Sequence, residues 1–159
     1  MKTIVALALL AFPVQGEKRS QPQFDELKKL EGAWVSVEKD HPANVTFRLS
    51  SGGSILVESM SMPNHSEMLT VYHPDGDDLV LTHYCMLGNQ PRMKAEKGQK
   101  EGVIRFAFDG GGNMKPSDKH MHSLTITFLD ADHIREDWTL FEGGTEQKVV
   151  TLNLVRKKE

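Results

Sequence analysis

Residues 44–62 read NVTFRLSSGGSILVESMSM, and this stretch decides the fold. Val45, Phe47 and Leu49 alternate with polar residues, which is the period of two expected of a strand with one wet face. The turn-forming run SGG at 51–53 follows and leads directly into a second apolar run. Because so short a connection reverses the chain, the stretch predicts two adjacent antiparallel strands.

The same pattern recurs along the rest of the chain, with connections rich in Gly, Pro, Asn and Asp. It predicts strands at Ala33–Glu38, Asn44–Ser50, Ser54–Met62, Glu67–His73, Asp78–Cys85, Arg92–Lys97, Val103–Phe108, Met121–Leu129, His133–Phe141 and Gln147–Val155. The one longer connection, residues 109–119, is predicted to be a mobile loop at a barrel mouth. It lacks the alternating acidic ligands and the closing glutamate of a calcium loop.

Ahead of these strands, the apolar residues Phe24, Leu27 and Leu30 recur at helical spacing after Pro22. They predict one short helix that ends before Gly32. A meander of short antiparallel strands curls readily, and closing it removes both unpaired edges. The predicted fold class is therefore all-β, an antiparallel up-and-down β-barrel of about ten strands with a short N-terminal helix.

The N-terminus has the pattern of an export signal. Lys2 supplies a positive start, residues 3–12 are almost entirely apolar, and Pro13 ends the run. This predicts a secretory signal peptide at residues 1–16, followed by an N-terminal segment and helix at 17–31 and a barrel domain at 32–159. The run is too short to span a bilayer, and it lacks the amphipathic period of a buried core helix, which is the alternative. A secreted or periplasmic location is expected.

Composition narrows the possible partners. The chain has 19 Lys and Arg against 22 Asp and Glu, a formal net charge of -3, and no basic patch or tail. A nucleic-acid partner and an anionic membrane surface are therefore not expected, nor is an integral membrane segment after signal cleavage. Cys85 is the only cysteine, so no disulfide forms within one chain. Burial of Cys85 is expected, because an accessible thiol outside the cytosol invites oxidation.

A family resemblance rests on three positions. A short helix leads into Gly32-Ala33-Trp34 at the start of the first strand, and Arg156 lies at the end of the last one. These residues resemble the calycin superfamily of lipocalins, fatty-acid-binding proteins and nitrobindin-like barrels. The resemblance implies that Gly32 and Trp34 form the barrel floor, with Arg156 as a cation over the indole ring.

Departures from the calycin pattern narrow the resemblance. Only a short segment around residues 41–43 separates the first two predicted strands, so the two-helix lid of fatty-acid-binding proteins is not expected. A helix after the last strand, as in lipocalins, is absent from the pattern, and ten strands suit the nitrobindin-like branch better. That branch holds haem through a histidine late in the chain. Here no histidine follows His133, and no cofactor is expected.

Polar residues that share the apolar face of a predicted strand are the first site candidates, because a buried polar group needs a partner or a purpose. They are Glu58, His83, Cys85, His122 and Glu136. A single bulge after Thr82 would exchange His83 for Tyr84 on the inner face. The structural alternative is that His83 and His122 form hydrogen bonds with Glu58 or Glu136, while His120 is exposed to solvent at the end of the loop.

The second group of candidates comes from the hairpin THYCMLGNQPRM at residues 82–93. Gly88, Asn89 and Pro91 are explained by turn and strand geometry. Four polar residues have no structural need and are predicted to ring one barrel end: His83, Tyr84, Gln90 and Arg92. Trp138, flanked by charged residues, completes the predicted ligand-binding set, although cross-strand ion pairing explains much of that charge.

The spacing of His and Cys residues bears on two further hypotheses, a metal site and a thiol enzyme. His83 with Cys85, and His120 with His122, place possible metal ligands two residues apart on a strand, about 6.6 Å between alpha carbons. The two pairs lie three strands apart, so no native metal site is expected. Cys85 and His83 are too separated on one strand for contact between a nucleophile and its base, and no catalytic residue is assigned.

The leading hypothesis is an exported barrel that binds a small hydrophobic or amphiphilic molecule in its lumen. The seven methionines after the predicted signal peptide suit a pocket that adapts to such a ligand, and they equally fill irregular cores. One alternative is a small-molecule enzyme, an isomerase or hydrolase, with His83 or Glu136 as general base. Another is a structural or protein-binding barrel, with a filled core and an exposed apolar patch.

Overall fold

Helix α1, Pro22–Lys28, is the first described element and forms as the sequence predicts. Its proline lies in the first turn, where a missing N–H costs nothing, and Phe24 and Leu27 are buried. The computed structural model describes residues 21–39 and 42–158. The predicted signal peptide lies outside the described residues.

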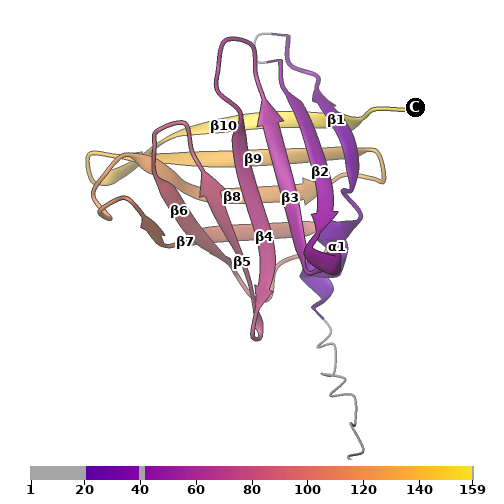
Figure 1. Ribbon diagram of the computed structural model, residues 1–159, viewed down its shortest axis with the longest axis horizontal. Coiled ribbons are helices and arrows are strands. Elements are labelled where there is room, and N and C mark those ends of the chain that lie inside the picture. The colour runs from indigo at the N-terminus through magenta and orange to yellow at the C-terminus, as the bar shows by residue number, and fades with distance from the viewer. Residues whose placement is uncertain (1–20, 40–41, 159) are drawn as a thin grey trace, which may run out of the picture.

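Ten strands follow α1, and each pairs antiparallel with the next (Figure 1). They are β1 (Gly32–Ser36), β2 (Asn44–Ser50), β3 (Ile55–Ser61), β4 (Met68–Asp75), β5 (Asp78–Tyr84), β6 (Gln90–Ala95), β7 (Val103–Gly112), β8 (His120–Phe128), β9 (His133–Glu142) and β10 (Thr145–Arg156). A 3-10 turn, η1 (Ser51–Gly53), joins β2 to β3. Trp34 of β1 pairs with Arg156 of β10, which closes the sheet into a barrel. The predicted fold class is confirmed.

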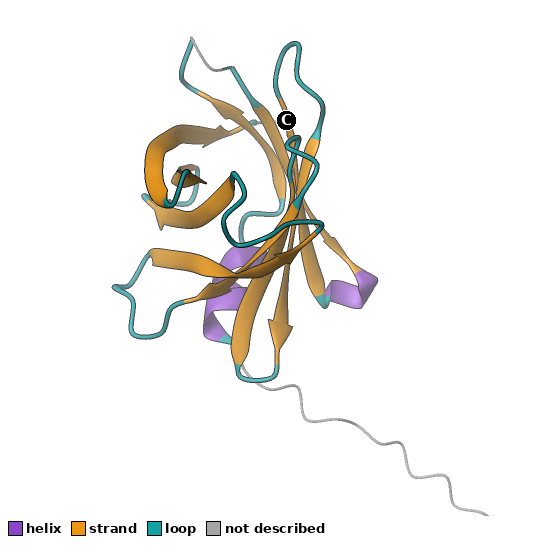
Figure 2. Cartoon of the chain, turned by 90° about the vertical axis from the view of Figure 1, so that its left-hand side faces the viewer, coloured by secondary structure: helices purple, strands orange, loops and turns teal. Residues whose placement is uncertain are grey.

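The strands curl around a common interior, and α1 lies at one end of it (Figure 2). Gln21 Nε2 donates to Gly76 O in the β4–β5 turn at 2.8 Å, so this end carries that turn. We call it the floor. The opposite end carries the connection between β3 and β4, and we call it the mouth.

The largest error among the predicted strand boundaries is at the end of β7, and several others shift by one or two residues. β7 runs on to Gly112 instead of ending at Phe108, so the predicted loop at 109–119 shortens to 113–119. Gly111 pairs with Pro91 of β6, and a register shift between Pro91 and Met93 accommodates the extra length. A Cβ at position 111 would lie 2.9 Å from Gln90 O. The glycine run therefore permits close strand approach, where the sequence pattern predicted a mobile loop.

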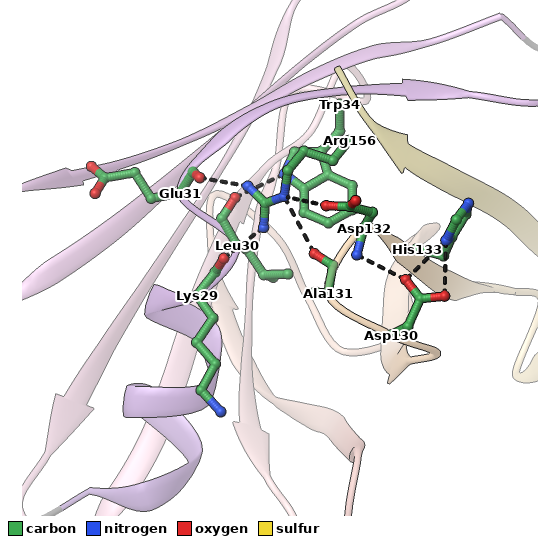
Figure 3. A network of polar contacts seen from close by, with 9 residues as sticks. All are labelled: Lys29, Leu30, Glu31, Trp34, Asp130, Ala131, Asp132, His133 and Arg156. Atoms are coloured by element: carbon green, nitrogen blue, oxygen red, sulfur yellow. Dashed lines mark hydrogen bonds and ion pairs between the residues drawn. The ribbon is translucent and has the colours of Figure 1, made fainter. Parts of the chain in front are cut away.

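The floor is built as the calycin resemblance implies (Figure 3). The Trp34 side chain is buried, and its Nε1 donates to Leu30 O at 2.8 Å. Arg156 Cζ lies 4.3 Å from the centroid of the Trp34 ring. Gly32 has a φ of 132°, and a Cβ there would lie 3.0 Å from Arg156 Nη1, so this position requires glycine.

Arg156 also ties the floor together through its guanidinium. Nη1 donates to Glu31 O at 2.8 Å, Nη2 donates to Lys29 O at 2.7 Å, and Nε donates to Ala131 O at 3.3 Å (Figure 3). Asp132 Oδ1 lies 3.4 Å from Nε. One side chain therefore joins the end of α1 to the β8–β9 turn.

The interior above the floor is filled by apolar side chains. The largest fully buried ones are Trp34, Tyr72, Phe47 and Phe106. Towards the mouth, Met60 and Met68 are cross-strand partners, and Met62 and Met121 pack partly buried against the core. Unbranched thioethers therefore cover part of the lumen at the mouth.

Candidate functional site

Polar side chains from opposite walls of the barrel meet in the lumen. Strand alternation turns Glu58 inward from β3, Thr70 and Tyr72 from β4, His83 from β5, and Glu136 and Trp138 from β9. All six are buried among the core residues. We call these six residues the lumen cluster. Four were predicted site residues: Glu58, His83, Glu136 and Trp138.

One half of the lumen cluster belongs to β3, β4 and β5. Tyr72 Oη donates to Glu58 Oε2 at 2.5 Å. Thr70 Oγ1 and His83 Nδ1 lie 3.1 Å apart and share a hydrogen bond. The cross-strand pairs Glu58–Thr70 and Thr70–His83 place these groups side by side on the inner face.

The other half comes from β9, across the lumen. Trp138 Nε1 donates to Glu136 Oε2 at 3.2 Å. The rings of His83 and Trp138 have centroids 4.8 Å apart and planes inclined by 43°. Because three strands separate β5 from β9 on the shorter way round the barrel, this contact spans the interior.

Each carboxyl of the lumen cluster has one oxygen without a hydrogen-bond partner. These atoms are Glu58 Oε1 and Glu136 Oε1, and both are buried. Neither carboxyl makes an ion pair with any residue that the structure describes. A buried polar atom left without a partner costs about 1–3 kcal/mol, and more when it is charged. The lumen cluster is therefore incomplete as a hydrogen-bonding network.

Burial sets the protonation of the lumen cluster. It raises the pKa of Glu58 to about 7, against hydrogen bonds from Tyr72 and Thr70 that lower it. Burial, and then the charge of Glu58, raise the pKa of Glu136 well above its ordinary value. Burial lowers the pKa of His83 to about 4. Burial therefore favours the protonated form of Glu136; near pH 7, His83 is neutral and Glu58 is close to half ionised.

His122 belongs to a separate group near the mouth. His120 Nδ1 donates to Asp118 O at 2.6 Å, since a carbonyl only accepts. His120 Nε2 and His122 Nδ1 lie 2.9 Å apart and share a hydrogen bond. Phe108 and Phe141 stack against His122, with centroids 5.2 and 4.9 Å away. Burial lowers the pKa of His122, which lies 4.0 Å from Glu146.

The expectation that His120 is exposed to solvent is wrong, because its side chain is fully buried. A register shift between Met121 and Ser123 breaks the alternation of β8 at this point. The His120 ring packs against Phe108, with centroids 4.3 Å apart, and against Phe141. The predicted bonds from His83 and His122 to Glu58 or Glu136 are also absent: the described partners are Thr70 and His120.

Besides His122, four predicted site residues lie apart from the lumen cluster. β5 ends at Tyr84, so Cys85 lies in the turn, where it is half-buried and burial raises the pKa of its thiol. Tyr84 is exposed on the outer face beside its partner Leu69. Gln90 Nε2 donates to Gly88 O at 3.3 Å, within the hairpin. Arg92 points outward and pairs with Asp75 at 2.7 Å.

Thr70 and Tyr72 are the members of the lumen cluster that the sequence reasoning missed. The sequence does indicate their orientation, because Met68, Thr70 and Tyr72 are alternate residues of one strand and so face the same side. Threonine and tyrosine are common strand residues, so their polarity drew no attention. His120 was missed as a buried group because a bulge cannot be read from alternation.

Two clefts open elsewhere on the surface. The larger, about 920 Å³, lies at the floor between α1, the β6–β7 connection and the β8–β9 turn, and its wall includes Leu30, Trp34, Ile104 and Phe128. The smaller, about 480 Å³, lies over β6 and β7. Neither is lined by the lumen cluster. We call the larger one the floor groove.

Exposed apolar side chains gather on the outer surface at the β5–β6 hairpin. Leu69 and Tyr84 are cross-strand partners and are 37% and 47% exposed. Met86 and Leu87 in the adjoining turn are 49% and 44% exposed. We call these four residues the hairpin patch. It matches one expectation for a protein-binding barrel, as does the filled interior.

The described residues form neither a metal-binding cluster nor a membrane-spanning helix. Among them, no three His, Cys, Asp or Glu side chains are grouped so as to hold a metal ion. Within residues 21–39 and 42–158, no helix is long and apolar enough to cross a membrane.

Comparison with known proteins supports the fold. No protein-family model matches the chain, and no curated protein matches it. The crystal structure of Rv2717c from M. tuberculosis is similar, with a TM-score of 0.55 and 16% identity, over 86% of this chain and 98% of that one. A protein of unknown function from the DUF3598 family of Nostoc punctiforme gives a TM-score of 0.48 and 13% identity, over 81% of this chain and 47% of that one. The closed antiparallel barrel is consistent with a calycin-like fold.

Proposed function

We propose that the barrel binds a small amphiphilic molecule in its lumen, with the polar head at the lumen cluster and the apolar body towards the mouth. The observation that carries this is the pair of buried, unpartnered oxygens Glu58 Oε1 and Glu136 Oε1. A fold that needed only a filled core would have no use for them. Met60, Met68 and Met121 lie towards the mouth, where flexible side chains move aside for an apolar chain.

The two tryptophans test where a ligand binds. Trp138 belongs to the lumen cluster, and Trp34 lines the floor groove. Bromooctanol, brominated on a carbon close to the hydroxyl, is an amphiphile whose bromine quenches indole fluorescence on contact. We expect it to quench the wild type and Trp34→Phe to a similar extent, and to leave Trp138→Phe unquenched.

Two outcomes would contradict this proposal. Quenching retained in Trp138→Phe and lost in Trp34→Phe would place the ligand in the floor groove. No saturable quenching of either tryptophan, with native mass spectrometry of the protein from its own source showing no bound molecule, would leave the lumen without a binding function. The hairpin patch would then favour a protein-binding barrel.

A second function has one observation in its favour. Two carboxyl groups with raised pKa values in an enclosed site are typical of acid–base enzymes. The pKa shifts favour a different general base from the two, His83 and Glu136, that the sequence suggested. Burial and the charge of Glu58 favour the protonated form of Glu136, and His83 is a weak base, so Glu58 is the better general base. Any turnover found should be lost in Glu58→Gln and retained in His83→Ala.

We also propose that the barrel is exported, on the pattern of residues 1–16. Expressed in a bacterium with its native N-terminus, the chain is expected in the periplasm with a mass that lacks residues 1–16. Replacing Leu9 and Leu10 with arginine breaks the apolar run and should leave the full-length chain in the cytoplasm. Full-length protein in the cytoplasm from both versions would contradict export.

A further inference from the structure

The lumen cluster contains acids without a basic partner. Among the buried polar residues that the structure describes are Glu58 and Glu136, and none is a lysine or an arginine. His83 is the basic group of the lumen cluster, and its contacts are Thr70 and Trp138. Most buried acids in proteins are paired. A ligand that enters this lumen therefore meets negative charge with no cation to balance it.

Once the carboxyls are ionised, their open positions are acceptors. Tyr72 and Trp138 already donate to the Oε2 atoms of Glu58 and Glu136, which leaves the Oε1 atom of each without a donor. A complementary head group supplies at least two donors and a positive charge. A carboxylate head supplies neither, and a hydroxyl supplies a single uncharged donor.

The surroundings favour an organic cation over a metal ion. Tyr72 and Trp138 are the donors to the two carboxyls, and the rings of Tyr72 and Phe106 have centroids 5.7 Å apart. Aromatic faces attract ammonium groups. A calcium ion needs six to eight oxygen ligands, which two carboxyls do not provide.

We propose that the polar head is a protonated primary amine, seated between Glu58 and Glu136 and donating to their Oε1 atoms. This rests on the proposed function, that the lumen takes an amphiphile. An alkylamine therefore displaces the proton that the two carboxyls otherwise retain. Tyr72 and His83, the other titratable groups that face the carboxyls, stay neutral near pH 7.

The test compares three probes with one apolar body: bromooctylamine, bromooctanol and bromooctanoate. Each is brominated on the same carbon close to the head group and is followed by quenching of Trp138. At about pH 8 we expect the amine to bind at least about tenfold more tightly than the alcohol, and the carboxylate most weakly. Amine binding should weaken as the pH falls from about 8 to about 6, because protonation of Glu58 then competes. Alcohol binding should change little.

Variants separate the head-group contact from general binding. Glu58→Gln and Glu136→Gln should each weaken amine binding about tenfold or more, and alter alcohol binding by less than about threefold. Glu67→Gln, at an exposed glutamate bonded to Ser59 on the outer face, is the matched control and should leave both unchanged.

The outcomes distinguish this inference from the proposed function. Equal binding of amine and alcohol, tightest binding of the carboxylate, or an amine affinity unaffected by both Glu→Gln changes would overturn the amine head and leave the amphiphile-binding lumen standing. Failure of all three probes to quench Trp138 would overturn the proposed function itself.

Discussion

Glu58→Gln is expected to raise the free energy of unfolding by about 3 kcal/mol at about pH 8, and to change it little at about pH 4. The pKa of Glu58 is raised from 4.5 to about 7 in the folded chain, because burial disfavours the charged form. A raised pKa means that the wild type loses stability as the pH rises from about 4.5 through about 7. Glutamine does not titrate, so the gap between the two proteins widens over that range.

Denaturant unfolding at a series of pH values measures this difference, with Glu67→Gln as the control that should follow the wild type. His83 acts in the opposite direction, because its pKa is lowered to about 4 and its contribution is lost as the pH falls below about 6.5. That contribution is common to all three proteins and cancels in the comparison. A Glu58→Gln effect of the same size at every pH would show that Glu58 does not titrate in this range.

Arg156→Ala is expected to lower the free energy of unfolding by about 2–4 kcal/mol. Its guanidinium donates to the backbone oxygens of Lys29, Glu31 and Ala131 and lies over Trp34. Hydrogen bonds from a charged group are worth about 1.5–3 kcal/mol each, and partial exposure of the site lets water replace part of this. Denaturant unfolding near neutral pH measures the loss.

Two further variants make the Arg156 result specific. Arg135→Ala removes an arginine that pairs on the surface with Asp137, and should leave the unfolding midpoint almost unchanged. Arg156→Lys keeps the charge without the planar fork and should restore only part of the stability. Equal effects of Arg156→Ala and Arg135→Ala would mean that the floor does not depend on its arginine.

The strands were predictable because their pattern is local. Alternation in Val45–Leu49 and turn residues at 51–53 specify a hairpin without reference to any other segment. The pattern failed where a strand departs from its period. The glycine run of β7 pairs as extended chain, and the bulge in β8 buries His120, since a partner strand rather than the local sequence decides both.

The candidate site was predictable only in part. Strand alternation correctly placed Glu58, His83 and Glu136 on inner faces. Cys85 does not share that face, because β5 ends at Tyr84 and Cys85 lies in the turn. Arg92 looked like a rim residue because it lies near His83 in the chain, but alternation sends it to the outer wall, beside Asp75. Sequence proximity is a poor guide to a shared surface in a sheet, because neighbouring residues face opposite sides.

The sequence by itself determined the strand count, the antiparallel order, the floor residues Trp34 and Arg156, and the acidic residues that face inward. The strands and the inward-facing acids follow from local periodicity and from how short turns connect strands, whereas the floor roles of Trp34 and Arg156 are what the calycin resemblance implied. Only the tertiary structure decided that β9 meets β5 across the lumen, that His83 stacks on Trp138, and that two carboxyl oxygens are left without donors. Barrel closure sets which side chains from distant strands meet, and burial then sets their pKa values.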